Sequence, residues 1–320
     1  MAKILITGGA GFIGSHLADG LAQMNHDIIV LDNLDPYYDR EIKNKNMDIV
    51  SAHPNCSFIH GDILDFALLE NIVKNDIEFI FHEAAQPGVR TSVENPLKPN
   101  DVNVKGTLAV LEAARKGNVK RVVNASSSSV YGKVEYLPFD EGHPTQPLSP
   151  YGVSKLVAEH YCRVYHEIYG LPTLSLRYFT VYGPRMRPDL AIPIFTRALL
   201  SGKPPEIFGD GEQTRDLTFI DDIISANLKL LETDSADGTV LNIGAGHRFS
   251  VNQLYDNLQR LVGCDIEPVY VDEMIGDARH TLSSIEKAKK LIGYEPKTTL
   301  AEGLEKFIVW YRANQDFYTQ

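Results

Sequence analysis

Short aliphatic and β-branched runs alternate with stretches of helical periodicity along the first half of the chain. The runs are apolar throughout and do not alternate with polar positions, which indicates strands that are buried on both faces. Such strands are predicted at 3–7, 27–32, 56–61, 79–84, 121–126 and 172–179. Amphipathic helices are predicted between them, near 12–24, 66–75, 100–116 and 151–169. Strands and helices in this order, joined by right-handed crossovers, predict an α/β fold with a doubly wound parallel sheet.

The pattern changes beyond about residue 180, where proline-rich and glycine-rich joints interrupt it at 183–193, 202–214 and 244–250. We predict that residues 1–180 form the sheet domain and that 181–320 mainly form a smaller lobe. The lobe is expected over the carboxyl edge of the sheet, where folds of this type bind their ligands. One strand-like run, at 239–244, is a candidate to return to the main sheet.

Composition narrows the possible functions. With 31 Lys+Arg residues against 42 Asp+Glu, the net charge is -11, the wrong sign for general nucleic-acid binding. No apolar run approaches the roughly 20 residues that span a bilayer, and the glycine-rich start lacks the pattern of a signal peptide. Cys56, Cys162 and Cys264 are widely spaced and suit neither a disulfide framework nor a metal site. We therefore expect a cytoplasmic protein without a metal and without nucleic-acid or membrane partners.

The first predicted strand leads into three regularly spaced glycines, Gly8, Gly11 and Gly14. Gly8 permits a tight turn, Gly11 allows backbone N–H groups to approach a pyrophosphate, and Gly14 allows the helix to pack closely on the strand. The helix that begins with Phe12 and Ile13 points the positive end of its dipole at that anion. Glycine turns are common, but this one follows a strand and opens a helix, as a dinucleotide site requires.

An acidic residue, Asp32, ends the second predicted strand. At this position a carboxylate accepts hydrogen bonds from the hydroxyls of an adenosine ribose and repels a 2′-phosphate. The next residues, Asn33 and Leu34, bring no cation that would favour NADP. The alternative is that Asp32 only caps the turn that follows. The glycines and the acid together predict a site for NAD, with Asn33 beside it.

The Gly-x-x-Gly-x-x-Gly spacing with Thr7 in front resembles the short-chain dehydrogenase/reductase superfamily, whose core is a Rossmann fold. The resemblance implies an adenine-contacting pair after the third strand, a pyrophosphate loop in "HEAAQ" (82–86), and a helix asparagine that supports the active site. These residues are Asp62, Ile63, Ala84, Ala85 and Asn103. As alternatives, Asp62 could cap a helix and His82 could be an ordinary strand-end histidine.

A tyrosine and a lysine, Tyr151 and Lys155, lie at the start of the helix predicted after the fifth strand. Residues four apart share one face of a helix. A phenol with a pKa of about 10 is a poor base, but a nearby ammonium and a cationic nicotinamide would favour the phenolate. The pair matches the Tyr-x-x-x-Lys of the superfamily, which implies catalysis by Tyr151 and a hold on the nicotinamide ribose by Lys155. The alternative is an aromatic–lysine pair on a surface helix.

Four serines, at 126–129, follow an apolar strand and precede Val130-Tyr131-Gly132. Oxidation of a substrate hydroxyl needs a donor or relay beside the tyrosine. The superfamily supplies that group from the end of strand five, and the resemblance gives this catalytic position to Ser127. A serine run is otherwise typical of a flexible linker.

The resemblance extends over essentially the whole chain, and the segments 177–188 and 207–223 are similar to extended nucleotide-sugar epimerases and dehydratases. It implies that Tyr151 takes the proton of the sugar 4-hydroxyl while a hydride passes from carbon 4 to NAD. Dehydratases and UDP-glucuronate decarboxylases carry carboxylates just before Val-Tyr-Gly, where this chain has Ser128 and Ser129. Without those acids, the 4-ketone is expected to take its hydride back on the other face, which is 4-epimerisation.

The substrate is expected to be a UDP-sugar, because Arg215 resembles the family's ligand for the diphosphate and Asp277 its ligand for the uridine ribose. The stretches 32–43 and 180–192 closely resemble UDP-glucuronate 4-epimerases. Ser128, Ser129 and Thr180 are expected to donate to the sugar carboxylate, and Arg185 is expected to add positive charge.

Other interpretations remain open. Arg187 and Arg197 are assigned to a solvated loop, and Met274 stands where many UDP-galactose epimerases have an arginine. The alternative substrates are UDP-glucose and UDP-N-acetylglucosamine, and UDP-glucuronate decarboxylation is a further alternative. A non-catalytic NAD-binding module would have lost the tyrosine or the lysine, and this chain keeps both. The family resemblance also implies a homodimer.

Overall fold

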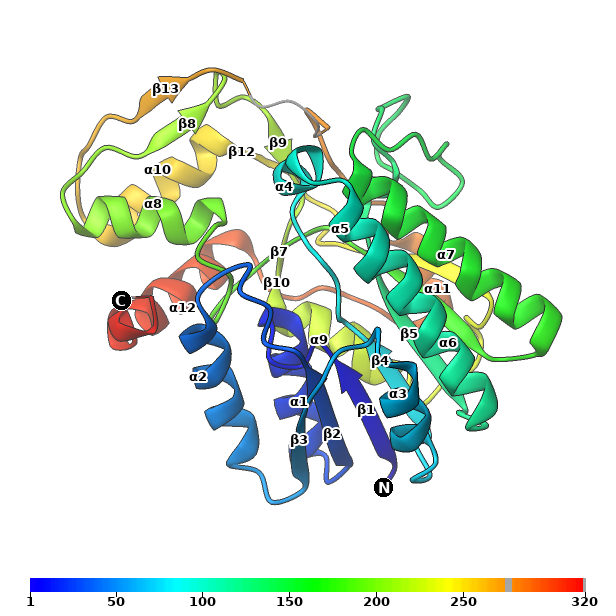
Figure 1. Ribbon diagram of the computed structural model, residues 1–320. Coiled ribbons are helices and arrows are strands. Elements are labelled where there is room, and N and C mark those ends of the chain that lie inside the picture. The colour runs from blue at the N-terminus through cyan, green and yellow to red at the C-terminus, as the bar shows by residue number, and fades with distance from the viewer. Residues whose placement is uncertain (274–277, 319–320) are drawn as a thin grey trace.

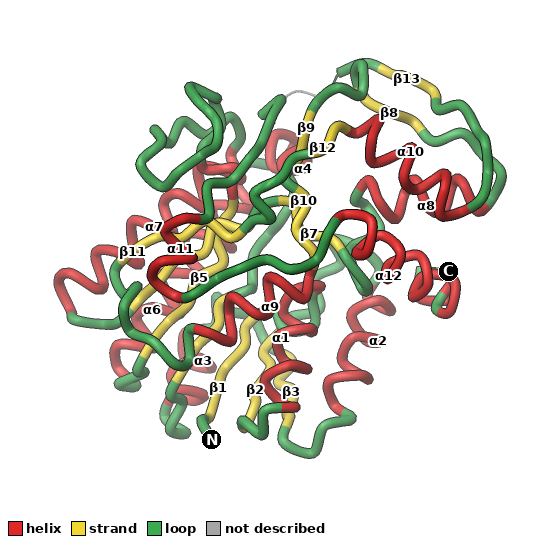
Figure 2. The backbone as a smooth tube through the Cα atoms, turned by 180° about the vertical axis from the view of Figure 1, so that it is seen from behind, coloured by secondary structure: helices red, strands yellow, loops and turns green. Residues whose placement is uncertain are grey.

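The computed structural model describes residues 1–273 and 278–318. In this part of the chain a seven-stranded parallel sheet has the order β11-β6-β5-β4-β1-β2-β3 (Figure 1, Figure 2). Its strands are β1 (Lys3–Thr7), β2 (Asp27–Asp32), β3 (Cys56–His60), β4 (Phe79–His82), β5 (Arg121–Ser127), β6 (Thr173–Tyr178) and β11 (Thr239–Ile243). The strand order reverses between β1 and β4, and such switch points form ligand crevices at the carboxyl edge. The predicted α/β fold with a doubly wound parallel sheet is confirmed.

Helices cover both faces of the sheet. Successive residues of each strand point to opposite sides, so apolar side chains on both faces need a covering layer. Ile4 and Ile6 of β1 pack into one apolar cluster, whereas Leu5 packs into the other. The first cluster includes residues of α1 (Phe12–Gln23), α2 (Arg40–Ser51) and α9 (Ile220–Lys229). The second includes residues of α3 (Phe66–Val73), α6 (Thr107–Lys116) and α7 (Pro150–Tyr169). Burial on both faces explains the apolar runs of β1, β2 and β4, whereas the edge strand β3 is exposed or half-buried at every position.

Much of the chain after residue 180 lies beyond the carboxyl edge of the sheet (Figure 1). Its strands pair as β7 (Thr180–Tyr182) with β10 (Leu217–Phe219), β9 (Thr214–Arg215) with β12 (Phe249–Ser250), and β8 (Glu206–Phe208) with β13 (Val269–Val271). Its other helices are α8 (Ala191–Leu200), α10 (Val251–Val262), α11 (Glu286–Ile292) and α12 (Leu300–Ala313). Two elements of this half belong to the first domain: β11 is a strand of the main sheet, and α9 helps to cover it. The domain boundary at residue 180 stays a prediction.

The helix predicted at 100–116 has two parts. It begins as a π-helix, η1 (Asn100–Gly106), and continues as α6. A Cβ on Gly106 would lie 2.4 Å from the side chain of Ile63, so the glycine lets this helix approach the loop after β3. Single π-helical turns are rare and occur often at functional sites.

Sequence reasoning missed the helix α2, which is polar on most of its surface. Its apolar side is made by Ile42, Met47 and Val50, all buried against the sheet. Asp39 caps it by accepting a hydrogen bond from the backbone N of Glu41 at 2.9 Å. The short elements α4 (Val89–Glu94), α5 (Leu97–Pro99), η2 (Ser128–Val130) and η3 (Gln315–Phe317) were also not predicted. Among the described residues, no helix has both the length and the apolar character needed to cross a membrane.

Candidate active site

The turn after β1 brings its three glycines into contacts that a side chain would prevent. Gly8 has φ +72°, and a Cβ there would lie 2.5 Å from the backbone N of Ala84. A Cβ on Gly14 would lie 2.4 Å from the carbonyl oxygen of Gly8, and one on Gly11 would lie 3.1 Å from it. Gly11 is the N-cap of α1 and supplies no side-chain cap. The N-terminal end of α1 is therefore available to an anion.

Asp32 lies at the end of β2 and is buried. Its carboxylate accepts hydrogen bonds from the backbone N of Ala10 at 3.1 Å and from that of Leu34 at 2.8 Å. Lys43 of α2 is also buried, and its Nζ lies 3.7 Å from the same carboxylate. The residues directly after Asp32 bring no cation, but α2 folds back and supplies one. Lys43 was missed because α2 was not predicted.

Replacing Asp32 by alanine is expected to weaken NAD binding by about tenfold or more, because a charge-assisted hydrogen bond to the ribose is lost. The same change leaves Lys43 without its counter-ion, so the preference for NAD over NADP should narrow. In Asp32→Ala the free ammonium of Lys43 should strengthen NADP binding. Adding Lys43→Met should remove this increase in NADP affinity, while NAD binding stays weak. Calorimetric titration with both dinucleotides measures these effects. Equally tight binding of NAD and NADP by the unaltered protein would contradict the role given to Asp32.

The residues assigned to the adenine lie next to this turn. Asn33 donates a hydrogen bond to the carboxylate of Asp62 at 2.8 Å, and Ile63 is buried. The helix α3 is capped by Asp65, so the alternative that Asp62 caps it does not hold. The other residues assigned to the cofactor begin α1 or follow β4, and they are Phe12, Ile13, Ala84 and Ala85.

Asn103, in the π-helix η1, connects the loop after β4 to α7. Its side chain accepts a hydrogen bond from the backbone N of Gln86 at 2.7 Å and donates to the carbonyl oxygen of Gln86 at 3.1 Å. It also donates to the hydroxyl of Ser154 at 2.9 Å, and Ser154 donates to the carbonyl oxygen of Tyr151 at 2.7 Å. Asn103 therefore fixes the cofactor loop relative to the backbone of Tyr151, which is a supporting role.

Tyr151 is the second residue of α7 and is half-buried. The helix is capped by Ser149, whose hydroxyl accepts a hydrogen bond from the backbone N of Gly152 at 3.1 Å. Burial raises the pKa of Tyr151, whereas a hydrogen bond with Ser127 and the charge of Arg187 act in the opposite direction. The predicted tyrosine and serine are thus in contact, and a cation that was not predicted acts on the phenol.

Lys155 lies one turn further along α7 and is buried. Its Nζ donates to the carbonyl oxygen of Ala125 at 2.7 Å, which fixes the ammonium on β5. Burial lowers the pKa of Lys155 to about 8, and the charge of Glu83 opposes this shift. The ammonium is therefore held in place beside Tyr151 by a strand, not by the phenol itself.

The four serines divide into one structural residue and three that stay half-buried at the edge of the sheet. Ser126 is buried and donates to a buried glutamate of α7 at 2.5 Å. Ser127 ends β5, and its hydroxyl accepts a hydrogen bond from the backbone N of Ser129 at 3.2 Å. Ser128 and Ser129 begin η2 and are half-buried like Ser127. Ser127 also donates to the hydroxyl of Ser129 at 3.2 Å, so the row of hydroxyls begins at the partner of Tyr151 and continues into η2.

Arg185 is buried at φ +64°, and its guanidinium donates to His16 at 2.8 Å and to Asp19 at 3.3 Å, both on α1. These contacts attach the loop after β7 to α1. The assignment of Arg185 to the sugar carboxylate stays a prediction. Thr180, at the start of β7, is half-buried and is held by a hydrogen bond from its backbone N to Asp216.

Arg187, which the sequence reasoning assigned to a solvated loop, is the cation that acts on Tyr151. Its guanidinium donates two hydrogen bonds to Asp189, at 3.0 and 3.2 Å, and lies 5.5 Å from the ring centre of Tyr37. Tyr37 also donates to Asp189, at 3.2 Å. The arginine side chain is only 19% exposed. Nothing in the local sequence separates it from Arg197, since only the fold brings residue 187 to α7.

The two residues assigned to the nucleotide end are Arg215 and Asp277. Arg215 belongs to β9, and its guanidinium donates to the carbonyl oxygens of Thr214 and Arg279, both at 3.0 Å. Asp277 lies outside the described residues. Both assignments stay predictions.

The fold and the site together define a class of protein. A doubly wound parallel sheet carries a glycine-rich dinucleotide turn, a carboxylate at the end of β2, and a tyrosine and a lysine on α7 beside a serine that ends β5. This arrangement is that of an NAD-dependent enzyme of the short-chain dehydrogenase/reductase type.

The chain belongs to the NAD dependent epimerase/dehydratase family, whose sequence model matches residues 4–244. It is 42% identical to a putative UDP-glucose 4-epimerase of Methanocaldococcus jannaschii, over 97% of this chain and 99% of that protein. It is 38% identical to a UDP-glucuronate 4-epimerase of Thermodesulfobacterium geofontis, over 98% and 97% of the two chains. A crystal structure of UDP-glucuronic acid 4-epimerase from Bacillus cereus, with UDP-glucuronic acid and NAD, matches at 37% identity and a TM-score of 0.93, over 97% and 99% of the two chains.

Proposed function

We propose that this protein is an NAD-dependent UDP-sugar 4-epimerase that interconverts UDP-glucuronate and UDP-galacturonate. The observation that carries the proposal is the row of hydroxyls at 127–129 beside Tyr151, which contains no carboxylate, together with the action of Arg187 on the same phenol. Relatives that are similar over nearly their full length are named UDP-glucuronate 4-epimerase, and one of them binds UDP-glucuronic acid and NAD.

The first turn fits the cofactor, because Gly8 and Gly14 let the backbone fold tightly there and no side chain caps the N-terminal end of α1. NAD, when bound, supplies a reversible acceptor for the hydride of sugar carbon 4. Gly8, Gly11 and the start of α1 would hold its pyrophosphate. The residues proposed for its adenosine end are Asp32, Asn33, Lys43, Asp62 and Ile63.

Tyr151 is the proposed base, and Ser127 is the proposed relay for the proton of the sugar 4-hydroxyl. The phenolate must form for oxidation to begin, and both Ser127 and Arg187 favour it against the effect of burial. Lys155, held on β5, would bind the nicotinamide ribose. Once the ketone presents its other face, carbon 4 would take back the hydride, and Tyr151 would return the proton to the 4-oxygen to give the inverted hydroxyl.

The hydroxyl row has a second proposed role, since oxidation of UDP-glucuronate at carbon 4 gives a β-keto acid. Such an acid loses carbon dioxide when its carboxylate bond aligns with the π system of the ketone. Ser128, Ser129 and Thr180 can donate hydrogen bonds to the carboxylate, and Arg187 can add charge. Donors that stabilise the carboxylate oppose decarboxylation, because the reaction would remove the negative charge that they bind.

Replacing Ser128, Ser129 or Thr180 by alanine is expected to raise the fraction of UDP-4-keto-pentose among the products in at least one case. A charge-assisted hydrogen bond is worth about 1.5–3 kcal/mol, enough to change this partitioning by about tenfold or more. Chromatography of the products formed from UDP-glucuronate measures the fraction. Ser127→Ala is the control, because it should slow oxidation without changing the partitioning. Unchanged partitioning in all three variants would remove the proposed hold on the carboxylate.

The sugar itself is decided by incubation with UDP-glucuronate, UDP-glucose and UDP-N-acetylglucosamine, followed by NMR of the products. Epimerisation of UDP-glucuronate supports the proposal. The alternative of a neutral sugar is favoured by the name of the Methanocaldococcus relative, putative UDP-glucose 4-epimerase. Turnover of UDP-glucose without turnover of UDP-glucuronate would establish that alternative. For the nucleotide, we propose Arg215 as the ligand of the diphosphate and Asp277 as that of the uridine ribose.

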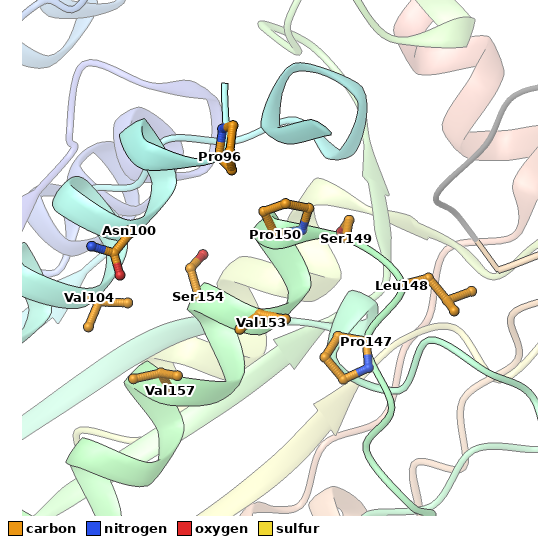
Figure 3. Close-up of a pocket in the computed structure, with 10 residues that line it drawn as sticks. All are labelled: Pro96, Asn100, Val104, Pro147, Leu148, Ser149, Pro150, Val153, Ser154 and Val157. Atoms are coloured by element: carbon orange, nitrogen blue, oxygen red, sulfur yellow. The ribbon is translucent and has the colours of Figure 1, made fainter. Parts of the chain in front are cut away.

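We also propose a homodimer formed through α7 and the segment before α6. Leu97, Leu148 and Val153 are exposed there by 73%, 51% and 48%. A hollow of about 520 Å³ lies beside Leu148 and Val153. Figure 3 shows Pro96 and Val104 across it from Val153. A second copy of the chain would cover these apolar groups. Light scattering should then give about twice the 35.6 kDa of one chain.

For the location of the protein we propose the cytoplasm. The supporting observation is that Cys56, Cys162 and Cys264 are all free thiols in the structure. Free thiols are typical of a reducing compartment. Fractionation of cells that express a labelled protein tests this proposal.

A further inference from the structure

Three loops at the carboxyl edge of the sheet meet at the hydroxyl of Tyr37, a residue that the mechanism above does not use. Tyr37 lies in the loop after β2, and its hydroxyl donates to the carboxylate of Asp189, in the loop after β7, at 3.2 Å. A Cβ on Gly88, in the loop after β4, would lie 2.5 Å from the same hydroxyl oxygen, and Gly88 has φ +100°. A side chain at position 88 would therefore displace Tyr37. Burial raises the pKa of Tyr37, so the hydroxyl keeps its proton and is the donor.

The loop that carries Tyr37 is itself held in place. The carboxylate of Asp35 accepts a hydrogen bond from the backbone N of Tyr37 at 2.9 Å and lies 3.0 Å from the Nζ of a lysine on α5. The ring of Tyr38 packs edge-on against that of Tyr37, with centroids 6.4 Å apart. The Nζ of Lys43, the partner of Asp32, lies 5.2 Å from the centre of the Tyr38 ring. The position of Tyr37 is thus tied to the residues proposed for the adenosine end of the cofactor.

On its other side, Tyr37 contacts both members of an ion pair. Asp189 accepts hydrogen bonds from Nε and Nη2 of Arg187, at 3.0 and 3.2 Å, and the oxygen that meets Nη2 is the one that accepts from Tyr37. The guanidinium carbon lies 5.5 Å from the centre of the Tyr37 ring, within the range of a cation–π contact. Within the part of the chain that the structure describes, Nη1 of Arg187 has no hydrogen-bond partner. Its two donors remain for an acceptor that a ligand brings.

Direct contacts also connect this cluster to the catalytic tyrosine. The helix α4 begins directly after Gly88. Its Ser92 accepts a hydrogen bond from the backbone N of Tyr151 at 3.1 Å and donates to the carbonyl oxygen of Val89 at 2.6 Å. The loop that touches Tyr37 is therefore attached to α7 at Tyr151 itself, and the cluster belongs to the same site.

We propose that Tyr37 is a positioning residue for the sugar specificity of this site: its hydroxyl and its ring hold the Arg187–Asp189 pair so that Nη1 of Arg187 is presented to the carboxylate of a bound uronate. The orientation of the arginine then depends on the loop that begins at Asp32, since Tyr37 belongs to that loop. The effect on the choice of sugar rests on the proposed function, whereas the attachment of the loop after β7 to Tyr37 does not.

Tyr37→Phe tests the effect on the sugar, because it keeps the ring beside the guanidinium and removes only the hydroxyl. Calorimetry with NAD present should show that the affinity for UDP-glucuronate falls by about tenfold, the effect of losing a hydrogen bond to a charged group, while the affinity for UDP-glucose is unchanged. Tyr136→Phe is the matched control, because the hydroxyl of Tyr136 donates to Asp140 at 3.0 Å in another loop. It should change neither affinity. Equal losses for both sugars in Tyr37→Phe, or no loss for UDP-glucuronate, would overturn the proposal.

Hydrogen exchange followed by mass spectrometry tests the attachment of the loop without any sugar. The backbone N atoms of Met186 and Leu190 donate within the loop after β7, at 3.3 and 3.4 Å. Their amides should exchange severalfold faster in Tyr37→Phe and in Asp189→Ala, and the double variant should exchange no faster than Asp189→Ala, because the two residues act as one pair. Unchanged exchange in Tyr37→Phe would overturn the proposal. If exchange is faster as expected but the unaltered protein binds no UDP-sugar, the proposed function fails and the hold of Tyr37 on this loop stands.

Discussion

Replacing Tyr151 by phenylalanine is expected to lower kcat for the epimerisation of UDP-glucuronate by about 1000-fold or more. A positioned acid–base group contributes about 10²–10⁴-fold, and here the same phenol serves both the oxidation and the return of the proton. The change removes only the hydroxyl that meets Ser127, so NAD and UDP-sugar should still bind. Product formation over hours, together with the binding of both ligands by calorimetry, measures the expected separation of rate from affinity.

Two variants on the same helix provide the comparison. Tyr161→Phe removes the hydroxyl of another half-buried tyrosine of α7 and should leave kcat unchanged. Lys155→Ala should lower the rate and also weaken NAD binding, because the ammonium is proposed to serve the ribose as well. Near-normal turnover by Tyr151→Phe would show that another group is the base.

The sheet could be predicted from the sequence because its physical cause is local. Strands that are buried on both faces have apolar residues at consecutive central positions, so 3–7 and 27–32 are recognisable without a structure. The dinucleotide turn is equally local, since Gly8 and Gly14 are required by contacts within one strand–turn–helix unit and with the neighbouring strand end. The pairing of Tyr151 with Ser127 was reached through the family resemblance.

The residues that sequence reasoning missed obtain their roles from distant partners. Lys43 pairs with Asp32 only because a polar helix folds back over β2. Arg187 acts on Tyr151 although it lies 36 positions further along the chain, and it is held there by Asp189. In the sequence Arg185 and Arg187 belong to one basic stretch, and charge alone does not distinguish their surroundings. Patterns along the chain do not contain this information, since long-range packing decides which of two similar side chains faces the site.

Arg187→Gln is expected to lower kcat/KM for UDP-glucuronate by about 10–100-fold while leaving the neutral UDP-sugars unaffected. A charge-assisted hydrogen bond to the sugar carboxylate would be lost, and neutral sugars have no group that makes it. The same arginine also lowers the pKa of Tyr151. Its loss therefore raises that pKa, and the acid limb should move to higher pH with every sugar. The comparison between sugars must be made on the alkaline plateau, where the phenolate is fully formed in both proteins.

Two other arginines separate this role from a general effect of charge. Arg197, exposed in the last turn of α8, provides a control, and Arg197→Gln should change neither the rate nor the choice of sugar. Arg185→Gln breaks the buried contacts to His16 and Asp19, so it should lower the melting temperature and loosen the loop. If Arg185→Gln removed the preference for the acidic sugar at full stability and Arg187→Gln did not, Arg185 would be the arginine that acts on the sugar carboxylate. Equal losses for charged and neutral sugars in Arg187→Gln would instead limit Arg187 to its effect on Tyr151.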